Sequence, residues 1–402
     1  MKTYAYTRKS LESFSKEEDL KKFNIPTEEE KTEKLKLLCQ RIESQEELFR
    51  IMKFKKRNRI MCTPIDYETT ILIRKMNHDL RKITRLKITG RSETISALRE
   101  ICSESMPLKI IKLDIEKFYD SICTRKIEKI VEKNLKTVHQ LRVNIKKYLQ
   151  WSQKNVNGLP TGISISASLA EYYLQQTLDQ GASSISGVYF YKRYVDDIII
   201  ICSSEREFEE YISDFKQQLP DELKLNTTEN KISKIELLTG KDNGNFNYLG
   251  YHFDITGKEK RTVALDIAQT KIKKRKTKFV KAFLQFFKDG NEEDLQKRFL
   301  LLNSGYKYWD SSRDRKMNAG ICNTYSEINL PSRSLKELQN FYRSCFFNPK
   351  FQLYHRIKMC HLSKETKKMI ISFDLQKHIK KRYFFNFSGL ELYRLSKCWR
   401  DI

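Results

Sequence analysis

The sequence predicts an α+β fold in which a mixed central region is flanked by helical regions. Only 13 glycines and 7 prolines occur among 402 residues, so long uninterrupted helices are expected. Residues 108–254 differ from the rest, because short β-branched runs alternate there with helical stretches. The length allows two or three packed subdomains. We therefore expect one mixed core with helical modules on either side.

Apolar residues recur at helical spacing in the first and last parts of the chain. The pattern runs from about residue 15 to 54 and continues from 71 to 85, where basic side chains are denser. From about Asp266 to the end the pattern is again helical, with many lysines and arginines. Residues 164–174 predict a further helix, whose packed side carries alanine and leucine.

The charge balance indicates a polyanionic partner. Lysine and arginine number 77 against 51 aspartates and glutamates, which gives a formal net charge of +26. This excess is larger and more dispersed than an enzyme acting on small molecules needs. Nucleic acid would attract such a chain, because basic side chains that contact phosphates release counterions. The competing interpretation is that the charge only keeps a basic protein soluble.

The nine cysteines form no C-x-x-C pair and no cluster at zinc-ligand spacing. We therefore expect free thiols in a reducing compartment. The first ten residues lack an apolar signal core, and no run approaches the ~20 apolar residues of a membrane span. We expect a cytoplasmic protein without a membrane partner.

Two strand ends in the central region carry carboxylates. Asp196 and Asp197 separate two β-prone apolar runs, which predicts a hairpin with acidic groups at its tip. Residues 109–113 predict another strand, which ends at Asp114. Asp114 and Asp196 are 82 positions apart (196 − 114), so only the fold can bring them together. The competing interpretation of the Asp-Asp pair is a solvated turn.

Crowded carboxylates in a basic chain predict a phosphoryl-transfer site. Like charges held this close need a cation to neutralise them. Transfer to a sugar hydroxyl uses two divalent ions ~4 Å apart, and Mg²⁺ prefers oxygen ligands. Asp114 and Asp196 would bridge two Mg²⁺ ions, with Mn²⁺ as the alternative metal. Asp197 would ligate or support them, and the Ile115 carbonyl would supply another oxygen.

Four motifs resemble those of the reverse transcriptases and occur in the same order as in that family. They lie at residues 113–122, 158–164, 194–197 and 247–251, and the resemblance covers roughly residues 75–255. It implies an RNA-directed DNA polymerase with a right-hand fold, a ferredoxin-like palm and fingers, and a helical thumb or C-terminal domain. The expected segments are an N-terminal helical region (1–70), fingers and palm-connecting segments (71–107 and 125–160), the palm (108–124 and 161–255) and the thumb or C-terminal domain (256–402).

The resemblance also implies roles for individual residues. Tyr119 would lie beneath the incoming sugar and exclude a 2′-hydroxyl, whereas its neighbour Phe118 is expected in the core. Lys231 would protonate the departing pyrophosphate as a catalytic acid. Further dNTP contacts are expected from Lys87, Arg91, Pro160, Thr161 and Gly162. The primer-grip hairpin and the thumb helix would bind nucleic acid through Tyr248, Leu249, Gly250, Lys271, Lys273, Lys274 and Lys278.

The amino-acid sequences of residues 113–122 and 158–174 resemble those of the bacterial defence-associated and abortive-infection (unknown-group) reverse transcriptases. This implies a cytoplasmic bacterial protein in antiphage defence, with an RNA template or non-coding RNA, a DNA product and dNTPs as partners. A homo-oligomer or a partner protein from a defence operon stays open. So do three other functions: a group II intron or retron-type enzyme, template-independent synthesis primed on a protein hydroxyl, and an inactive RNA-binding scaffold.

Overall fold

The computed structural model describes residues 5–56, 59–86, 90–228, 231–310 and 315–399, which form two compact units. The first unit comprises Met1–Ile88 and Leu108–Glu236. The second unit comprises Thr89–Pro107 and Leu237–Ile402. Each unit is described separately below.

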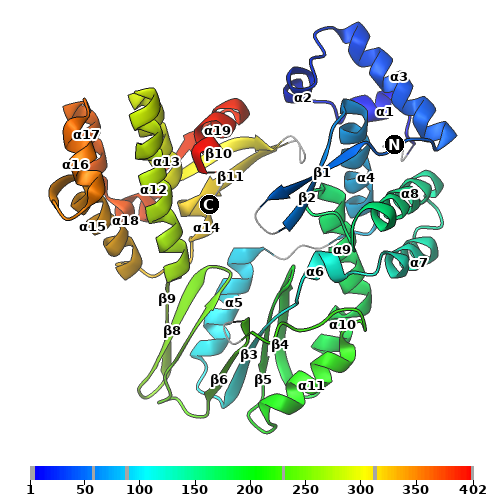
Figure 1. Cartoon of the computed structure of the whole chain (residues 1–402). Helices are drawn as coiled ribbons and strands as arrows, with labels where there is room; N and C mark the ends of the chain where they lie inside the picture. The colour runs from blue at the N-terminus through cyan, green and yellow to red at the C-terminus, as the bar shows by residue number, and fades with distance from the viewer. Residues whose placement is uncertain (1–4, 57–58, 87–89, 229–230, 311–314, 400–402) are drawn as a thin grey trace. The chain divides into compact units, whose positions relative to one another are not determined.

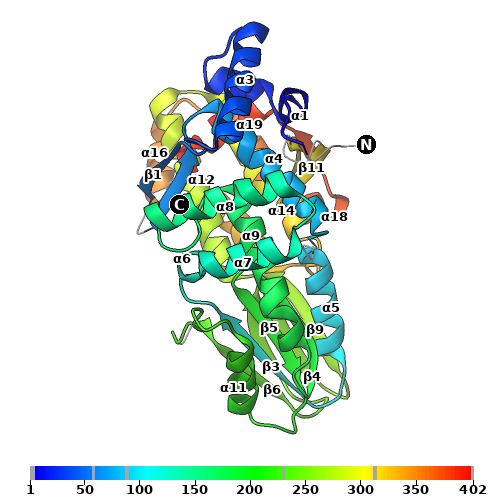
Figure 2. The same ribbon diagram turned by 90° about the vertical axis from the view of Figure 1, so that its right-hand side faces the viewer.

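The first unit begins with helices packed around α4, which contacts α3, α8 and α9 (Figures 1 and 2). Asp66 starts α4 by accepting a hydrogen bond from the Thr69 amide at 2.9 Å, a standard N-cap. These helices are α1 (Arg8–Glu12), α2 (Glu17–Lys22), α3 (Glu28–Ser44), α4 (Tyr67–Ile83), α7 (Thr124–Asn134), α8 (His139–Asn155) and α9 (Ser164–Thr177). The predicted helix at 164–174 is thereby confirmed.

The expectation of helix from residue 45 to 54 is wrong. Helix α3 ends where Gln45 adopts a left-handed backbone with φ of 59°. The chain then forms an antiparallel hairpin of β1 (Ile51–Lys56) and β2 (Arg59–Pro64), in which Phe54 pairs with Met61. The alternating sequence of β1 also suits a strand, and pairing with β2 overrides the helical spacing.

A four-stranded sheet forms the core of the first unit. Its order is β4 (Val188–Tyr194), β5 (Asp197–Cys202), β3 (Leu108–Asp114) and β6 (Ser233–Leu237). Residues 198–201 of β5 are all isoleucines with at most 1% exposure, so the central strand is buried on both faces. Figure 1 shows α10 (Asp179–Ser183) and α11 (Phe208–Gln218) beside this sheet.

In the second unit, α5 (Arg91–Ser103) packs on an antiparallel sheet of β7 (Gly244–Tyr248), β8 (Tyr251–Gly257) and β9 (Arg261–Ile267). The buried Arg261 donates hydrogen bonds of 2.8–2.9 Å to four backbone carbonyls around the end of α5. These bonds satisfy its guanidinium and fix the segment that leaves the helix.

The remainder of the second unit is mostly helical, around an aromatic cluster in which Phe279 stacks on Tyr342 at 4.3 Å. The longer helices are α12 (Gln269–Asp289), α13 (Glu292–Asn303), α15 (Arg333–Phe347), α16 (Gln352–Met359), α17 (Lys364–Ser372), α18 (Leu375–Lys381) and α19 (Gly389–Ser396). The expectation of helix alone is wrong, because strands β10 (Gly305–Asp310), β11 (Arg315–Gly320) and β12 (Phe384–Asn386) form a further sheet. β12 pairs in parallel with β10 from some 80 residues away, a long-range contact that local spacing cannot indicate.

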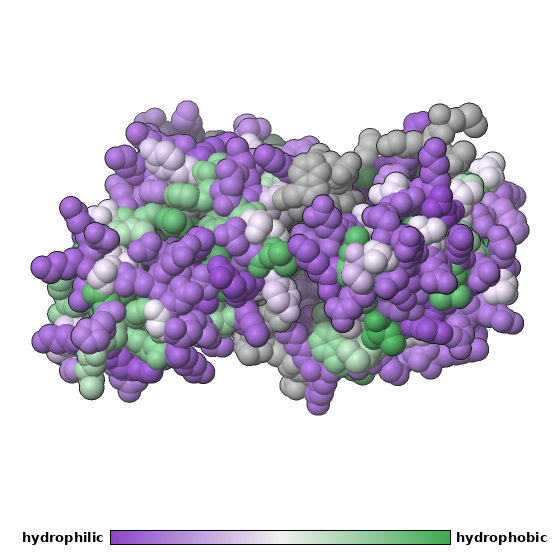
Figure 3. Space-filling view, turned by 90° about the horizontal axis from the view of Figure 1, so that it is seen from above, coloured by the Kyte–Doolittle hydropathy of each residue, from purple (hydrophilic) through white to green (hydrophobic). Residues whose placement is uncertain are grey.

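All nine cysteines are free thiols, as predicted. Across the described residues, none of the helices has the length and apolar character needed to cross a membrane. Hydrophilic side chains cover most of the face seen in Figure 3, with smaller apolar areas between them.

Candidate active site

The structure brings the predicted carboxylates together at one end of the central sheet. Strands β3 and β5 are antiparallel, and their register sets Asp114 directly opposite Asp197. Asp196 lies in the two-residue turn that joins β4 to β5, beside Val195 with φ of 61°. The Ile115 amide donates to the Asp196 carbonyl at 3.2 Å, which ties the end of β3 to this turn. Asp196 is thus in a turn, but this turn is tied to the end of β3, and Asp196 and Asp197 are only partly exposed.

Asp114 is 6% exposed and has two polar side-chain partners. Its carboxylate pairs with the Lys231 ammonium at 3.0 Å and accepts from the Asn226 amide group at 3.1 Å. The Asn226 backbone amide also donates to the Asp114 carbonyl at 2.8 Å. Lys231 thus lies at the carboxylates, although its predicted role as an acid remains a prediction.

The chemistry of these carboxylates fits divalent cations. Burial raises the pKa of Asp196 above its ordinary value, and the negative charges of Asp197 and Asp114 raise it further. A bound cation would relieve this repulsion. Among the described residues, no group of three or more His, Cys, Asp or Glu side chains is arranged as a ready metal site. Mg²⁺ is commonly held by one or two carboxylates together with substrate phosphates, which this arrangement permits.

A buried ion network supports the turn from behind. Arg193, with a side chain 2% exposed, pairs with Glu171 of α9 at 2.8 Å and Asp179 of α10 at 2.7 Å. Its guanidinium also donates to the Val195 carbonyl at 3.2 Å, and Tyr191 donates to Asp179 at 2.8 Å. The strained turn residue is therefore held by a charge-assisted cluster that anchors β4 to two helices.

Tyr119 lies close to the carboxylates. It belongs to the short helix α6 (Phe118–Ser121). Burial raises the pKa of Tyr119, and the charges of Asp196 and Glu171 add to this rise. Its neighbour Phe118 is 4% exposed and packs in the core, as predicted. The sugar-selecting role of Tyr119 stays a prediction.

The loop after α8 packs against Tyr119 through its backbone. Leu159 donates its amide to the Tyr119 carbonyl at 2.8 Å, and the Ser152 hydroxyl donates to the Gly158 carbonyl at 2.5 Å. Gly158 has φ of 64°, and a Cβ there would lie 2.1 Å from the Tyr119 carbonyl oxygen. Only glycine fits this left-handed position and close approach.

The other side of the loop is bound to β2. The Cys62 amide donates to the Thr161 carbonyl at 2.8 Å, while a Cβ on Gly162 would lie 2.7 Å from the Cys62 carbonyl oxygen. Pro160, which precedes Thr161 in the loop, is buried. Pro160, Thr161 and Gly162 thus form a rigid bridge between α6 and the β1–β2 hairpin, and their contact with a nucleotide remains a prediction.

Other predicted nucleotide and primer contacts belong to the second unit. Arg91 is the first residue of α5. Burial raises the pKa of Tyr325, while the positive charge of Arg275, and then that of Arg91, lower it. A hairpin is present where the primer grip is predicted, with Leu249 and Gly250 in its turn at φ of 48° and 89°, and its contact with a primer stays a prediction. Tyr248, which precedes them, is 1% exposed. Lys87 lies outside the described residues.

The four predicted nucleic-acid-binding lysines of α12 do not share one face. Lys271, Lys274 and Lys278 line a common recess, as spacings of three and four residues on a helix allow. Lys273 lies toward Glu337, whose pKa is lowered by Lys276 and further by Lys273. The predicted basic helix is confirmed. Some of its basic side chains line the recess, and others lie on the side of Glu337.

Sequence reasoning missed Asn226 and the network of Arg193. The amide of Asn226 is 112 positions from Asp114, so no local pattern identifies it. A weak signal existed for Arg193, because a charged residue stands in a predicted strand two positions before the turn residue Val195. An arginine inside such a strand needs buried partners.

A sheet in which β5 is antiparallel to both β3 and β4, with acidic residues at a strand end and at the adjoining turn, has the arrangement of a right-hand polymerase palm. Residues 45–253 match the family described as reverse transcriptase (RNA-dependent DNA polymerase), which is more than half of the chain. The chain belongs to this family, as the four motifs predicted.

Comparison with curated proteins gave no match. Solved structures similar to the chain include an apo telomerase from Candida tropicalis truncated from its C-terminal domain, at 14% identity and a TM-score of 0.37. That match covers 55% of each chain. A telomerase from Candida albicans in complex with a fragment of telomeric RNA matches at 14% identity and a TM-score of 0.36, over 57% of this chain and 48% of the other. The chain thus spans about half the length of these structures.

Proposed function

We propose that this chain is an active RNA-directed DNA polymerase that joins a primer 3′-hydroxyl to the α-phosphate of a dNTP. The observation that carries the proposal is the register of β3 and β5, which opposes Asp114 to Asp197 beside Asp196. Membership of the reverse transcriptase family supports it. An inactive scaffold would not need three crowded carboxylates, of which Asp196 has its pKa raised by burial and further by the charges of Asp197 and Asp114.

Each residue has a defined part in the proposed reaction. Asp114, Asp196 and Asp197 would hold two Mg²⁺ ions. When bound, such ions activate the attacking hydroxyl and stabilise charge on the leaving phosphates. The ring of Tyr119 would exclude a 2′-hydroxyl, and the Lys231 ammonium would give its proton to the leaving pyrophosphate. Lys231 would first have to exchange Asp114 for the phosphate, since the two pair at 3.0 Å.

The test is primer extension on an RNA template with the Asp196→Asn/Asp197→Asn variant. We expect Mg²⁺-dependent dNTP incorporation to fall at least ~100-fold, because about 3 kcal/mol of transition-state stabilisation is lost with the ligands. Asp221→Asn is the matched control, because this carboxylate is fully exposed and lies outside the site. Incorporation close to wild type in the double variant would leave the scaffold as the better function.

We further propose that the polymerase serves antiphage defence together with a non-coding RNA. The support is that the motif sequences at residues 113–122 and 158–174 resemble those of defence-associated reverse transcriptases. Bacteria expressing the wild-type chain, but not the Asp196→Asn/Asp197→Asn variant, should resist phage infection. Sequencing the nucleic acid that co-purifies with the chain would identify the template. A recovered intron or retron RNA would favour those enzymes, and DNA covalently attached to the protein without a template would favour protein-primed synthesis.

A further inference from the structure

A recess of about 500 Å³ lies beside α12 in the second unit. This volume falls within the range of small-ligand sites. Four basic side chains of α12 line it: Lys271, Lys274, Arg275 and Lys278. None of its described lining residues is acidic. Its described lining therefore carries several positive side chains and no negative one.

Arg275 is half-buried and has no carboxylate partner among the described residues. Its guanidinium donates to the Leu302 carbonyl and lies 5.9 Å from the ring centre of Tyr325. Within the described part of the chain, no carboxylate forms an ion pair with Arg275 or Lys278. Burial lowers the pKa of Lys278, and the charges of Arg275 and Lys274 lower it further. Like charges gathered in this way are costly unless an anion joins them.

Aromatic rings complete the recess. Tyr306 of β10 is half-buried and lines it beside Tyr325 and Trp399. The Trp399 indole donates to the Lys278 carbonyl at 2.8 Å, and its ring lies 5.5 Å from the Lys278 ammonium. Rings beside cations form a combination that suits a base and its phosphate.

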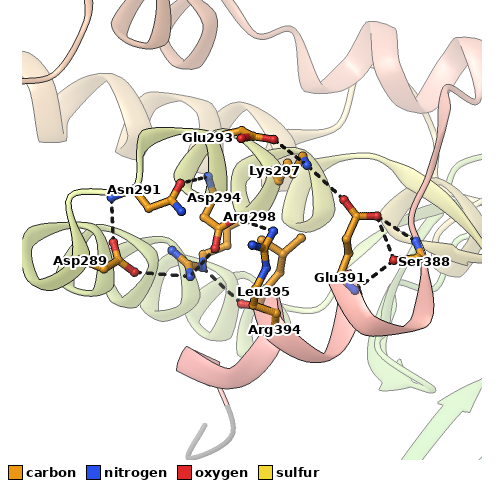
Figure 4. A network of polar contacts seen from close by, with 10 residues as sticks. All are labelled: Asp289, Asn291, Glu293, Asp294, Lys297, Arg298, Ser388, Glu391, Arg394 and Leu395. Atoms are coloured by element: carbon orange, nitrogen blue, oxygen red, sulfur yellow. Dashed lines mark hydrogen bonds and ion pairs between the residues drawn. The ribbon is translucent and has the colours of Figure 1, made fainter. Parts of the chain in front are cut away.

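The wall formed by α19 and the 3-10 helix η2 (Lys397–Trp399) is held in place by an ion network (Figure 4). Lys297 of α13 pairs with Glu391 of α19 at 3.1 Å, and Arg394 pairs with Asp294 at 2.9 Å. Figure 4 shows these side chains pointing toward one another between the two helices. The network links α13 to α19, the helix that carries the lining residues Leu392 and Ser396.

We propose that this recess is a nucleotide-binding site, in which Lys274, Arg275 and Lys278 hold the phosphates and Tyr306 contacts the base. The ligand is a free nucleotide or an unpaired nucleotide of a strand, since both present the same chemistry. All lining residues belong to the second unit, whereas the catalytic carboxylates belong to the first. The inference therefore goes beyond the proposed polymerase reaction and does not depend on it.

The test is calorimetric titration of the whole chain, in EDTA, with ATP, inorganic triphosphate and 5′-phosphorylated oligo(dT). Binding to the catalytic carboxylates would need divalent cations, whereas the recess contains no carboxylate and should bind without them. Lys274→Gln/Lys278→Gln should raise the Kd at least about tenfold. Lys288→Gln/Lys336→Gln removes the same charge from exposed lysines of this unit and should leave the Kd within about twofold.

A second pair of variants tests the base contact. Tyr306→Leu should weaken ATP binding at least about fivefold while Tyr306→Phe, which keeps the ring, should not. Tight binding of ATP would identify a free nucleotide, and binding of oligo(dT) alone would identify an unpaired nucleotide in a strand; either outcome supports the site. Triphosphate binding as tightly as ATP, or equal effects of the two lysine pairs, would overturn it. Melting temperatures of all variants check that each is folded.

Discussion

Replacing Arg193 with methionine should destabilise the first unit and impair polymerisation together. The guanidinium is almost fully buried, and its partners Glu171 and Asp179 are 17% and 26% exposed. Arg193→Met fills a similar volume but leaves two partly buried carboxylates facing each other. Removing one partner of a buried ion pair typically costs ~3–5 kcal/mol, a large fraction of the ~5–15 kcal/mol that stabilises a domain.

Urea unfolding measures this loss directly. With a denaturant dependence of ~1–3 kcal/mol per molar, the loss of ~3–5 kcal/mol should lower the unfolding midpoint of the first unit by about 1–5 M. Arg206→Met is the matched control, because Arg206 also pairs with two carboxylates but is 28% exposed. Arg206→Met should therefore lower the unfolding midpoint much less than Arg193→Met does, because solvent screens an exposed ion pair.

A charge-balanced variant separates stability from positioning. Arg193→Met/Glu171→Gln/Asp179→Asn removes all three charges and should regain much of the lost stability. It still lacks the hydrogen bond from Arg193 to the Val195 carbonyl, so primer extension should remain below wild type. An Arg193→Met protein that unfolds at the same urea concentration as Arg206→Met would refute the stability argument. Full activity in the triple variant would refute the positioning role.

Three further experiments test other parts of the structure. Tyr119→Ala should raise ribonucleotide incorporation relative to deoxynucleotide incorporation, while Tyr119→Phe should preserve the discrimination; unchanged selectivity in a folded Tyr119→Ala protein would remove the steric role. RNA binding should weaken steeply as salt rises, and a flat plot of log K against log salt would contradict a polyanion partner for the +26 charge. Burial raises the pKa of the Cys102 and Cys202 thiols to about 12, so thiolate forms only at high pH and iodoacetamide at pH 8 should spare both in the folded protein. The half-buried Cys39, Cys123, Cys360 and Cys398 should be alkylated before these two, as peptide mass analysis of a time course can check.

The sequence was sufficient for the features of the site that have local signatures. Alternating and β-branched runs predicted the strands ending at Asp114 and beginning at Asp197, and the fold then opposed the two residues. The hairpin turn at Leu249 and Gly250 was likewise predicted from its motif. Such features depend on the chemistry of a few consecutive residues, and sequence patterns record that chemistry.

Features that arise from long-range pairing were not predictable in this way. β12 joins its sheet by pairing with β10, about 80 residues away. A strand of only three residues is too short to show a periodic pattern, so its partner could not be predicted. Phe54 has neighbours at helical spacing, yet pairing with Met61 makes its segment a strand. Tertiary contact overrides local preference in both cases.

The lysines of α12 show why composition alone could not define a binding surface. A helix turns by about 100° per residue, so seven basic residues among eleven cannot all face one ligand. Glu337 of α15 pairs with Lys276 and lies toward Lys273, so its charge offsets part of the positive charge on that side of the helix. The opposite arc carries Lys274, Arg275 and Lys278, where rings and backbone carbonyls are the neighbours and no carboxylate lines the recess. The positive charge of the helix is therefore offset in part on the side of Glu337 and is not offset by any described lining residue of the recess, so an anion would be attracted more strongly to the recess.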